Sequence, residues 1–119
     1  MVPGETKPSN AGKVRPRTRM QLELPNGAKY EGETVEGVAE GEGHLRFANG
    51  DVYKGEFIGG TMHGKGIWSY NTGDVYSGEF ANGLANGHGK FQSAEGDTYE
   101  GEYAANKPHG KGLKTFSSG

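Results

Sequence analysis

Cysteine and long apolar runs are both missing from this 119-residue sequence. Without cysteine, the chain can form neither a disulfide framework nor a thiolate metal site. No apolar run is long enough for a transmembrane helix or for the hydrophobic region of a secretory signal peptide. Hydrophobic residues make up only 31% of the chain, which argues against an ordinary two-layer core. This composition leaves two alternatives, a disordered chain or a repeat protein with a thin local core.

Glycine, by contrast, is abundant, and the positions of its 23 residues decide between these alternatives. A Tyr-x-Gly-Glu motif recurs every 23 residues, beginning at Tyr30, Tyr53, Tyr76 and Tyr99. A Gly-x-Gly motif has the same period and begins at Gly41, Gly64, Gly87 and Gly110. A third glycine column comprises Gly27, Gly50, Gly73, Gly96 and Gly119. Three columns in one register predict four tandem copies of one structural unit.

Each copy contains two stretches in which residue types alternate with a period of two, as in β-strands. They are joined by segments such as 48–50, Ala-Asn-Gly, whose final glycine predicts a three-residue hairpin loop. This loop length pairs Leu45 with Tyr53, and Gly43 with Gly55, so that apolar side chains share one face. The paired glycines are predicted to leave a trough without side chains, in which an aromatic ring of the next hairpin can lie.

The opposite face of these strands carries charged side chains. The same register places oppositely charged residues across from each other: Arg19 and Glu33, Lys65 and Glu79, and Lys90 and Glu100. Exposed pairs of this kind contribute about 0.2–1 kcal/mol each at most. We therefore interpret this face as solvated, with a recognition surface as the less favoured alternative.

The motif Tyr-x-Gly-Glu-Phe, followed by His-Gly-x-Gly and an Asn/Asp-Gly turn, resembles the MORN repeat (membrane occupation and recognition nexus). Its clearest copy runs from Asp51 to Phe57 and continues through residues 63–66. The resemblance covers about residues 20–119 and is specific for the fold, but it implies little about function. Four residues depart from the pattern of the other copies: Thr34, Glu40, Ser93 and Lys114. At the last two positions, a polar residue replaces an apolar one.

The resemblance implies an all-β fold, an elongated single-layer antiparallel sheet of tandem hairpins. We expect nine strands, including a lone first strand at residues 20–24. Residues 20–119 are thus expected to form the repeat array, as a half hairpin plus four repeats. Residues 1–19 have no periodicity and are expected to form a flexible basic arm. The basic residues of this arm are Lys7, Lys13, Arg15, Arg17 and Arg19. The remainder is acidic, with 14 acidic and 8 basic side chains in residues 21–119.

The repeat also accounts for motifs that otherwise suggest catalysis or cofactor binding. His63 and His109 occupy the same position two repeats apart, about 20 Å by strand spacing, too far for one metal ion. His44 and His88 fall at other repeat positions. The Gly-x-Gly pairs lack the following helix and the Gly-Lys-Ser/Thr of a phosphate-binding loop. We therefore expect a chain without catalytic residues, metal or cofactor.

These features predict a non-catalytic protein–protein scaffold or adaptor. Its aromatic and glycine trough would bind a helix or strand of a partner. The predicted partner-binding residues are Tyr53, Phe57, Trp68, Tyr70, Tyr76, Phe80, Tyr99 and Tyr103. The alternative for each of these rings is a place in the core. Because MORN repeats occur in cytoskeletal assemblies such as ciliary radial spokes, the resemblance implies an axonemal or other cytoskeletal assembly. The corresponding location is cytoplasmic and cytoskeleton-associated, with a cilium or flagellum as one setting.

Two further functions stay open, a membrane adaptor that binds anionic phospholipid and a targeting module of a larger protein. The acidic array should be repelled by an anionic leaflet, so we expect only weak lipid contact, through the basic arm. The same acidity argues against nucleic acid as a partner. The sequence ends in the loop column at Gly119. We therefore expect either self-association through an open C-terminal edge strand or a longer array from which this chain is a piece.

Overall fold

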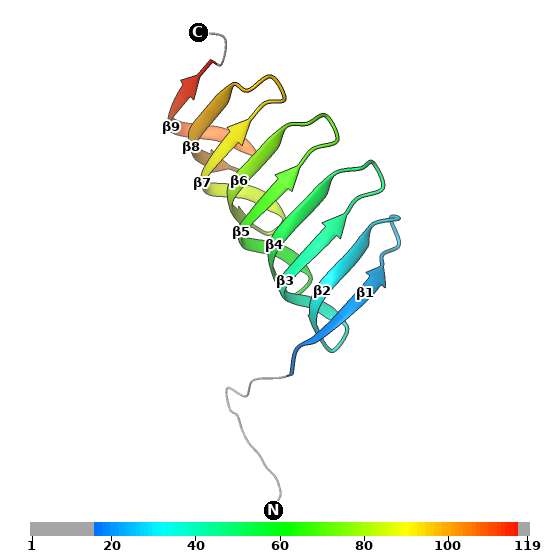
Figure 1. Ribbon diagram of the computed structural model, residues 1–119. Helices are drawn as coiled ribbons and strands as arrows, with labels where there is room; N and C mark the ends of the chain where they lie inside the picture. The colour runs from blue at the N-terminus through cyan, green and yellow to red at the C-terminus, as the bar shows by residue number, and fades with distance from the viewer. Residues whose placement is uncertain (1–15, 117–119) are drawn as a thin grey trace, which may run out of the picture.

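Residues 16–116, the part that the computed structural model describes, form one open sheet of nine antiparallel strands in sequence order (Figure 1). The strands are β1 (Thr18–Glu23), β2 (Lys29–Val35), β3 (Val38–Arg46), β4 (Val52–Ile58), β5 (Thr61–Ser69), β6 (Val75–Ala81), β7 (Leu84–Gln92), β8 (Thr98–Ala104) and β9 (Lys107–Thr115). The molecule is elongated, with principal extents of 68 × 30 × 19 Å. The predicted all-β repeat fold is confirmed. The first strand, however, begins at Thr18, two residues earlier than predicted, because its pairing with β2 extends to Thr34.

Two rows of turns bound the sheet, and Figure 1 shows the strands bending between them. One row contains the predicted three-residue loops. In the loop at residues 48–50, the backbone N–H of Phe47 donates to Asp51 O at 2.9 Å, and Gly50 has φ +99°. The register that this loop sets pairs Leu45 with Tyr53 and Gly43 with Gly55, as predicted.

The second row contains two-residue turns, which the sequence pattern did not specify. Both residues have positive φ at each turn, namely Glu36-Gly37, Gly59-Gly60, Asn82-Gly83 and Ala105-Asn106. This is the type I′ geometry, whose twist matches that of the flanking strands. The backbone N–H of Gly60 donates to Ala39 O at 2.9 Å, and Gly83 donates to Met62 O at 3.0 Å. Each of these turns is therefore tied to the preceding hairpin.

The glutamate of each Tyr-x-Gly-Glu motif lies at a β-bulge rather than on a regular strand. Between β2 and β3, the register shifts between Gly32 and Thr34. The Oε1 atom of Glu33 accepts a hydrogen bond from the backbone N–H of Glu42 at 2.8 Å. This hydrogen bond is the main reason why the pKa of Glu33 is lowered. Glu79 accepts the corresponding hydrogen bond from the backbone N–H of His88 at 3.1 Å. Glu33 and Glu79 thus stabilise the bend in their strands, a role that a purely solvated face does not require.

The tyrosine of each motif covers a glycine of its own strand and a glycine of the strand that follows. Tyr53 is completely buried, and its hydroxyl donates to the carbonyl of Glu56 at 3.0 Å. A Cβ at Gly55 would lie 2.7 Å from the hydroxyl oxygen of Tyr53, and a Cβ at Gly66 would overlap the same ring. The predicted trough therefore exists, but the prediction that the next hairpin fills it is wrong. Tyrosine and glycine are two residues apart on one strand and so share a face.

The core is a continuous row of edge-to-face aromatic contacts along the concave side of the sheet. Phe57 contacts Tyr53 of its own repeat at a centroid distance of 5.2 Å and Tyr30 of the preceding repeat at 5.0 Å. Phe80 contacts Tyr76 and Tyr53 in the same way, at 5.2 and 4.9 Å. Each repeat therefore completes the core of the repeat before it, as expected for a linear array.

Candidate partner-binding groove

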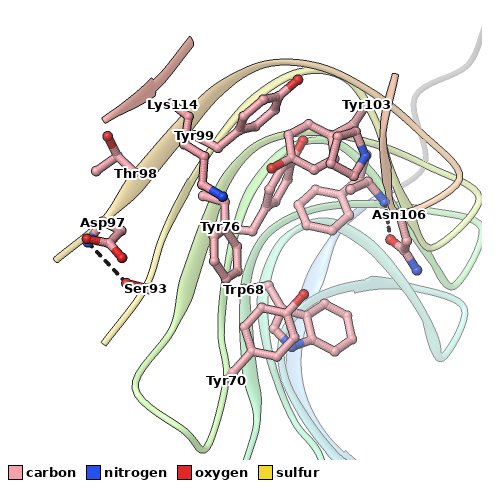
Figure 2. A pocket seen from close by; sticks show the side chains of 14 residues that line it. Trp68, Tyr70, Tyr76, Ser93, Asp97, Thr98, Tyr99, Tyr103, Asn106 and Lys114 are labelled. Atoms are coloured by element: carbon pink, nitrogen blue, oxygen red, sulfur yellow. Dashed lines mark hydrogen bonds between the residues drawn. The ribbon is translucent and has the colours of Figure 1, made fainter. Parts of the chain in front are cut away.

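A groove of about 580 Å³ opens on the concave face, over the strands β5 to β9 (Figure 2). Its lining is mainly aromatic and comprises Trp68, Tyr70, Tyr76, Phe80, Ala85, Phe91, Ser93, Asp97, Thr98, Tyr99, Tyr103, Asn106, Pro108 and Lys114. Six of the eight predicted partner-binding residues are in this set. The other two, Tyr53 and Phe57, lie outside it and are 0% and 2% exposed. Their positions match the core alternative, as do those of Tyr76, Phe80 and Tyr103, which line the groove but are only 3%, 4% and 8% exposed. Trp68, Tyr70 and Tyr99 are the more exposed of the eight, a division that sequence alone did not give.

The groove opens where two apolar columns of the repeat become polar. One column runs through Leu45, Trp68 and Phe91 to Lys114, and the other runs through Phe47 and Tyr70 to Ser93. Phe47 stacks on Trp68 with a centroid distance of 4.7 Å and an interplanar angle of 21°. Tyr70 contacts Phe91 in the next repeat at 6.3 Å.

The corresponding contact in the last repeat would join Ser93 to Lys114. A serine side chain is too short to cover its neighbour as a ring does, so the space above Tyr99 is left open. Figure 2 shows Ser93 and Lys114 on one side of this space, and the rings of Tyr76, Tyr99 and Tyr103 beside them. The two departures from the repeat pattern thus determine where the groove lies.

The three-residue loops form one rim of the groove and are joined by aspartates. Asp51 is 7% exposed and accepts hydrogen bonds from Asn71 N at 2.8 Å and from the Trp68 indole nitrogen at 3.2 Å. Asp74 accepts a hydrogen bond from Ala94 N at 2.8 Å. Each aspartate therefore positions the loop of the next repeat. Sequence reasoning missed these residues, although an aspartate follows the glycine in three successive loops.

Burial raises the pKa of the hydroxyls of Tyr70, Tyr76 and Tyr103 in the groove, so these three stay protonated near neutral pH. Burial, followed by the neighbouring Tyr103, raises the pKa of Tyr76 to about 12. Burial is also the largest cause of the raised pKa of Tyr70, and the carboxylates of Asp51 and Asp74 add to it. The groove therefore offers neutral ring faces and hydroxyl groups rather than phenolates.

Charged residues on the opposite face lie in the predicted register, with Arg19 opposite Glu33, Lys65 opposite Glu79 and Lys90 opposite Glu100. Arg17 forms an ion pair with Glu33 at 3.3 Å. His88 contacts Glu100 at 3.3 Å and Glu102 at 3.5 Å, and these hydrogen bonds raise the pKa of the imidazole. Of the predicted basic arm, Arg17 and Arg19 are described, whereas Lys7, Lys13 and Arg15 lie outside the described residues.

No cluster of three or more metal-ligating side chains occurs within residues 16–116. His63 and His109 lie on β5 and β9, four strands apart in the sheet. In the same part of the chain, no helix has the length and apolarity needed to cross a bilayer. The groove itself combines aromatic rings with a few polar groups, as ligand-binding pockets commonly do.

Comparison with known families matches the MORN repeat to residues 30–52, 53–75, 76–98 and 99–119. The four matched segments follow one another without a gap and together cover well over half of the chain. Each match begins at the tyrosine of the Tyr-x-Gly-Glu motif. No curated protein matches the sequence.

Proposed function

Because the chain belongs to the MORN repeat family, whose repeats are generally non-catalytic binding modules, we propose that it is a protein–protein scaffold. The groove over β5 to β9 is its binding site, and a helix or strand of a partner inserts apolar side chains there. The proposal goes beyond family membership in naming the kind of ligand and the surface that receives it.

The observation that supports this proposal is an aromatic groove that remains partly open. Tyr70 is 39% exposed, and Trp68, Phe91 and Tyr99 are half-buried. A volume of about 580 Å³ lies within the usual range of ligand pockets and suits several side chains of a peptide segment. Aromatic residues are also the most frequent energetic anchors of protein interfaces.

We further propose that this scaffold belongs to a cytoskeletal assembly, such as a ciliary or axonemal one. An elongated sheet in which every strand pairs with its sequence neighbours can hold partners at defined spacing along its axis. The membrane alternative has less support. Arg17 is already engaged by Glu33, and the array carries more acidic than basic residues, which disfavours an anionic leaflet.

The test compares a substitution in the groove with a substitution of an exposed residue outside the groove. The immobilised full chain, its Tyr70→Ser variant and its Ile67→Ser variant are used to capture proteins from a lysate of ciliated cells. Ile67 is 45% exposed, similar to Tyr70, but it does not line the groove and is therefore the matched control. We expect cytoskeletal proteins that bind the wild type and the Ile67→Ser variant and are lost with Tyr70→Ser.

Equal capture by all three forms would refute groove binding. The same chains are also sedimented with phosphatidylserine vesicles. Strong vesicle binding that Tyr70→Ser leaves intact, combined with no groove-dependent protein, would favour the membrane alternative.

A further inference from the structure

The loop-side wall of the groove combines ring faces with carboxylates. Tyr70 stands between Trp68, at a centroid distance of 5.9 Å, and Phe91, at 6.3 Å. Tyr70 is the most exposed of the aromatic residues that line the groove. Asp51 accepts a hydrogen bond from the backbone N–H of Asn71, next to Tyr70, and the backbone N–H of Tyr70 donates to the carbonyl of Asp74, both at 2.8 Å. Besides linking the loops, the carboxylates of Asp51 and Asp74 give the rim a negative charge.

The loops at this rim carry acidic residues and no basic ones. The two loops at residues 71–74 and 94–97 contain Asp74, Glu95 and Asp97 and no basic residue. Asp97 itself lines the groove. The basic residue of the lining, Lys114, lies on β9, and its Nζ is 5.2 Å from the centre of the Phe116 ring. The groove therefore has a negative loop side, with its ammonium group on the last strand.

We propose that the segment bound in the groove is basic and amphipathic, with a lysine or arginine in contact with Tyr70. This inference rests on the proposed function. A cation is attracted to the face of an aromatic ring, and the carboxylates of Asp74 and Asp97 strengthen that attraction. Apolar neighbours in the segment fill the space above Tyr76 and Tyr99. An acidic segment is repelled at this rim, and a wholly apolar one brings no positive charge to it.

The probe is a phage-displayed library of random short peptides, panned against the immobilised full chain. We expect the enriched peptides to combine a lysine or arginine with an aromatic or aliphatic residue. Replacing that basic residue with glutamine should weaken binding to the wild type about tenfold, measured by fluorescence anisotropy. The same replacement should have little effect on binding to the Tyr70→Leu variant, because leucine keeps apolar area but has no ring face.

Asp74→Asn tests the charge at the rim. The amide oxygen of the asparagine can still accept the hydrogen bond from the backbone N–H of Ala94. The matched control is Glu36→Gln, which makes the same change of charge on the other row of turns. We expect Asp74→Asn to weaken the basic peptide several-fold and Glu36→Gln to leave it unchanged. Equal effects would mean that only net charge matters and would overturn the inference.

The two proposals fail in different ways. Enriched peptides that bind in the groove but contain no basic residue would overturn the inference alone. If no enriched peptide loses affinity for Tyr70→Ser, the proposed function fails with it.

Discussion

The closed part of the array, around Tyr53 and Phe57, and the open groove over β5 to β9 are built from the same 23-residue repeat. In the closed part, Phe47 stacks on Trp68, and Tyr53 beneath is completely buried. In the groove, Ser93 takes the position of Phe47, and Tyr99 is only half-buried. The comparison shows that one set of repeat positions maintains the sheet and another determines whether a repeat is core or binding site.

The largest effect should come from filling the space beneath the tyrosine in the closed part. Gly66→Ala would place a Cβ against the ring of Tyr53, which has no room to move, whereas Gly112→Ala meets the less buried Tyr99. We expect Gly66→Ala to lower the free energy of unfolding by about 3 kcal/mol and Gly112→Ala by about half as much. Urea denaturation followed by circular dichroism measures both. Equal and small losses would contradict the proposed packing.

Breaking the aspartate link between loops should have the next largest effect. Asp51→Ala removes a buried carboxylate that accepts hydrogen bonds from the indole N–H of Trp68 and the backbone N–H of Asn71. We expect a loss of about 2 kcal/mol, against about 1 kcal/mol for Asp74→Ala, which is less buried. Thermal unfolding of the two variants gives the comparison. A larger loss for Asp74→Ala would show that burial is not the deciding factor.

Converting the groove into a closed repeat is the third test. Ser93→Phe restores the ring found at the position of Phe47, and we expect it to cover Lys114 and fill the space above Tyr99. The variant should be more stable than the wild type by about 1 kcal/mol. It should also lose the groove-dependent binding described above. Unchanged binding in a correctly folded variant would place the site elsewhere.

The smallest effect should be on the charged face. The hydrogen bonds of His88 with Glu100 and Glu102 raise its pKa above the ordinary value of 6.5. Because the folded-state pKa is the higher one, this stabilisation is fully present below the unfolded pKa and disappears as pH rises through the folded pKa. The stability difference between wild type and His88→Gln should therefore shrink with rising pH. Denaturation series at acid and alkaline pH measure this stability difference. A difference that grows with rising pH would contradict the prediction.

Several features of the fold could be predicted from local pattern. Loop length and strand parity together specify which residues pair, so the register of Leu45 with Tyr53 follows from the sequence. The bulge at Glu33 could not be predicted in this way, because it depends on a side chain reaching the backbone of the neighbouring strand. The row of two-residue turns was likewise not specified, since residues as different as Glu36 and Asn82 adopt the same positive φ there.

The sequence by itself therefore determined the period, the strands and the hairpin register, because alternation and loop glycines act within one hairpin. The tertiary structure alone decided which rings are core and which line the groove. Tyr53 and Tyr99 both begin a Tyr-x-Gly-Glu motif and occupy the same position in the repeat, yet one is buried and the other is half-buried. The physical reason is that the burial of each ring depends on side chains from the adjacent repeats. The combined effect of these side chains is known only once the hairpins are packed side by side.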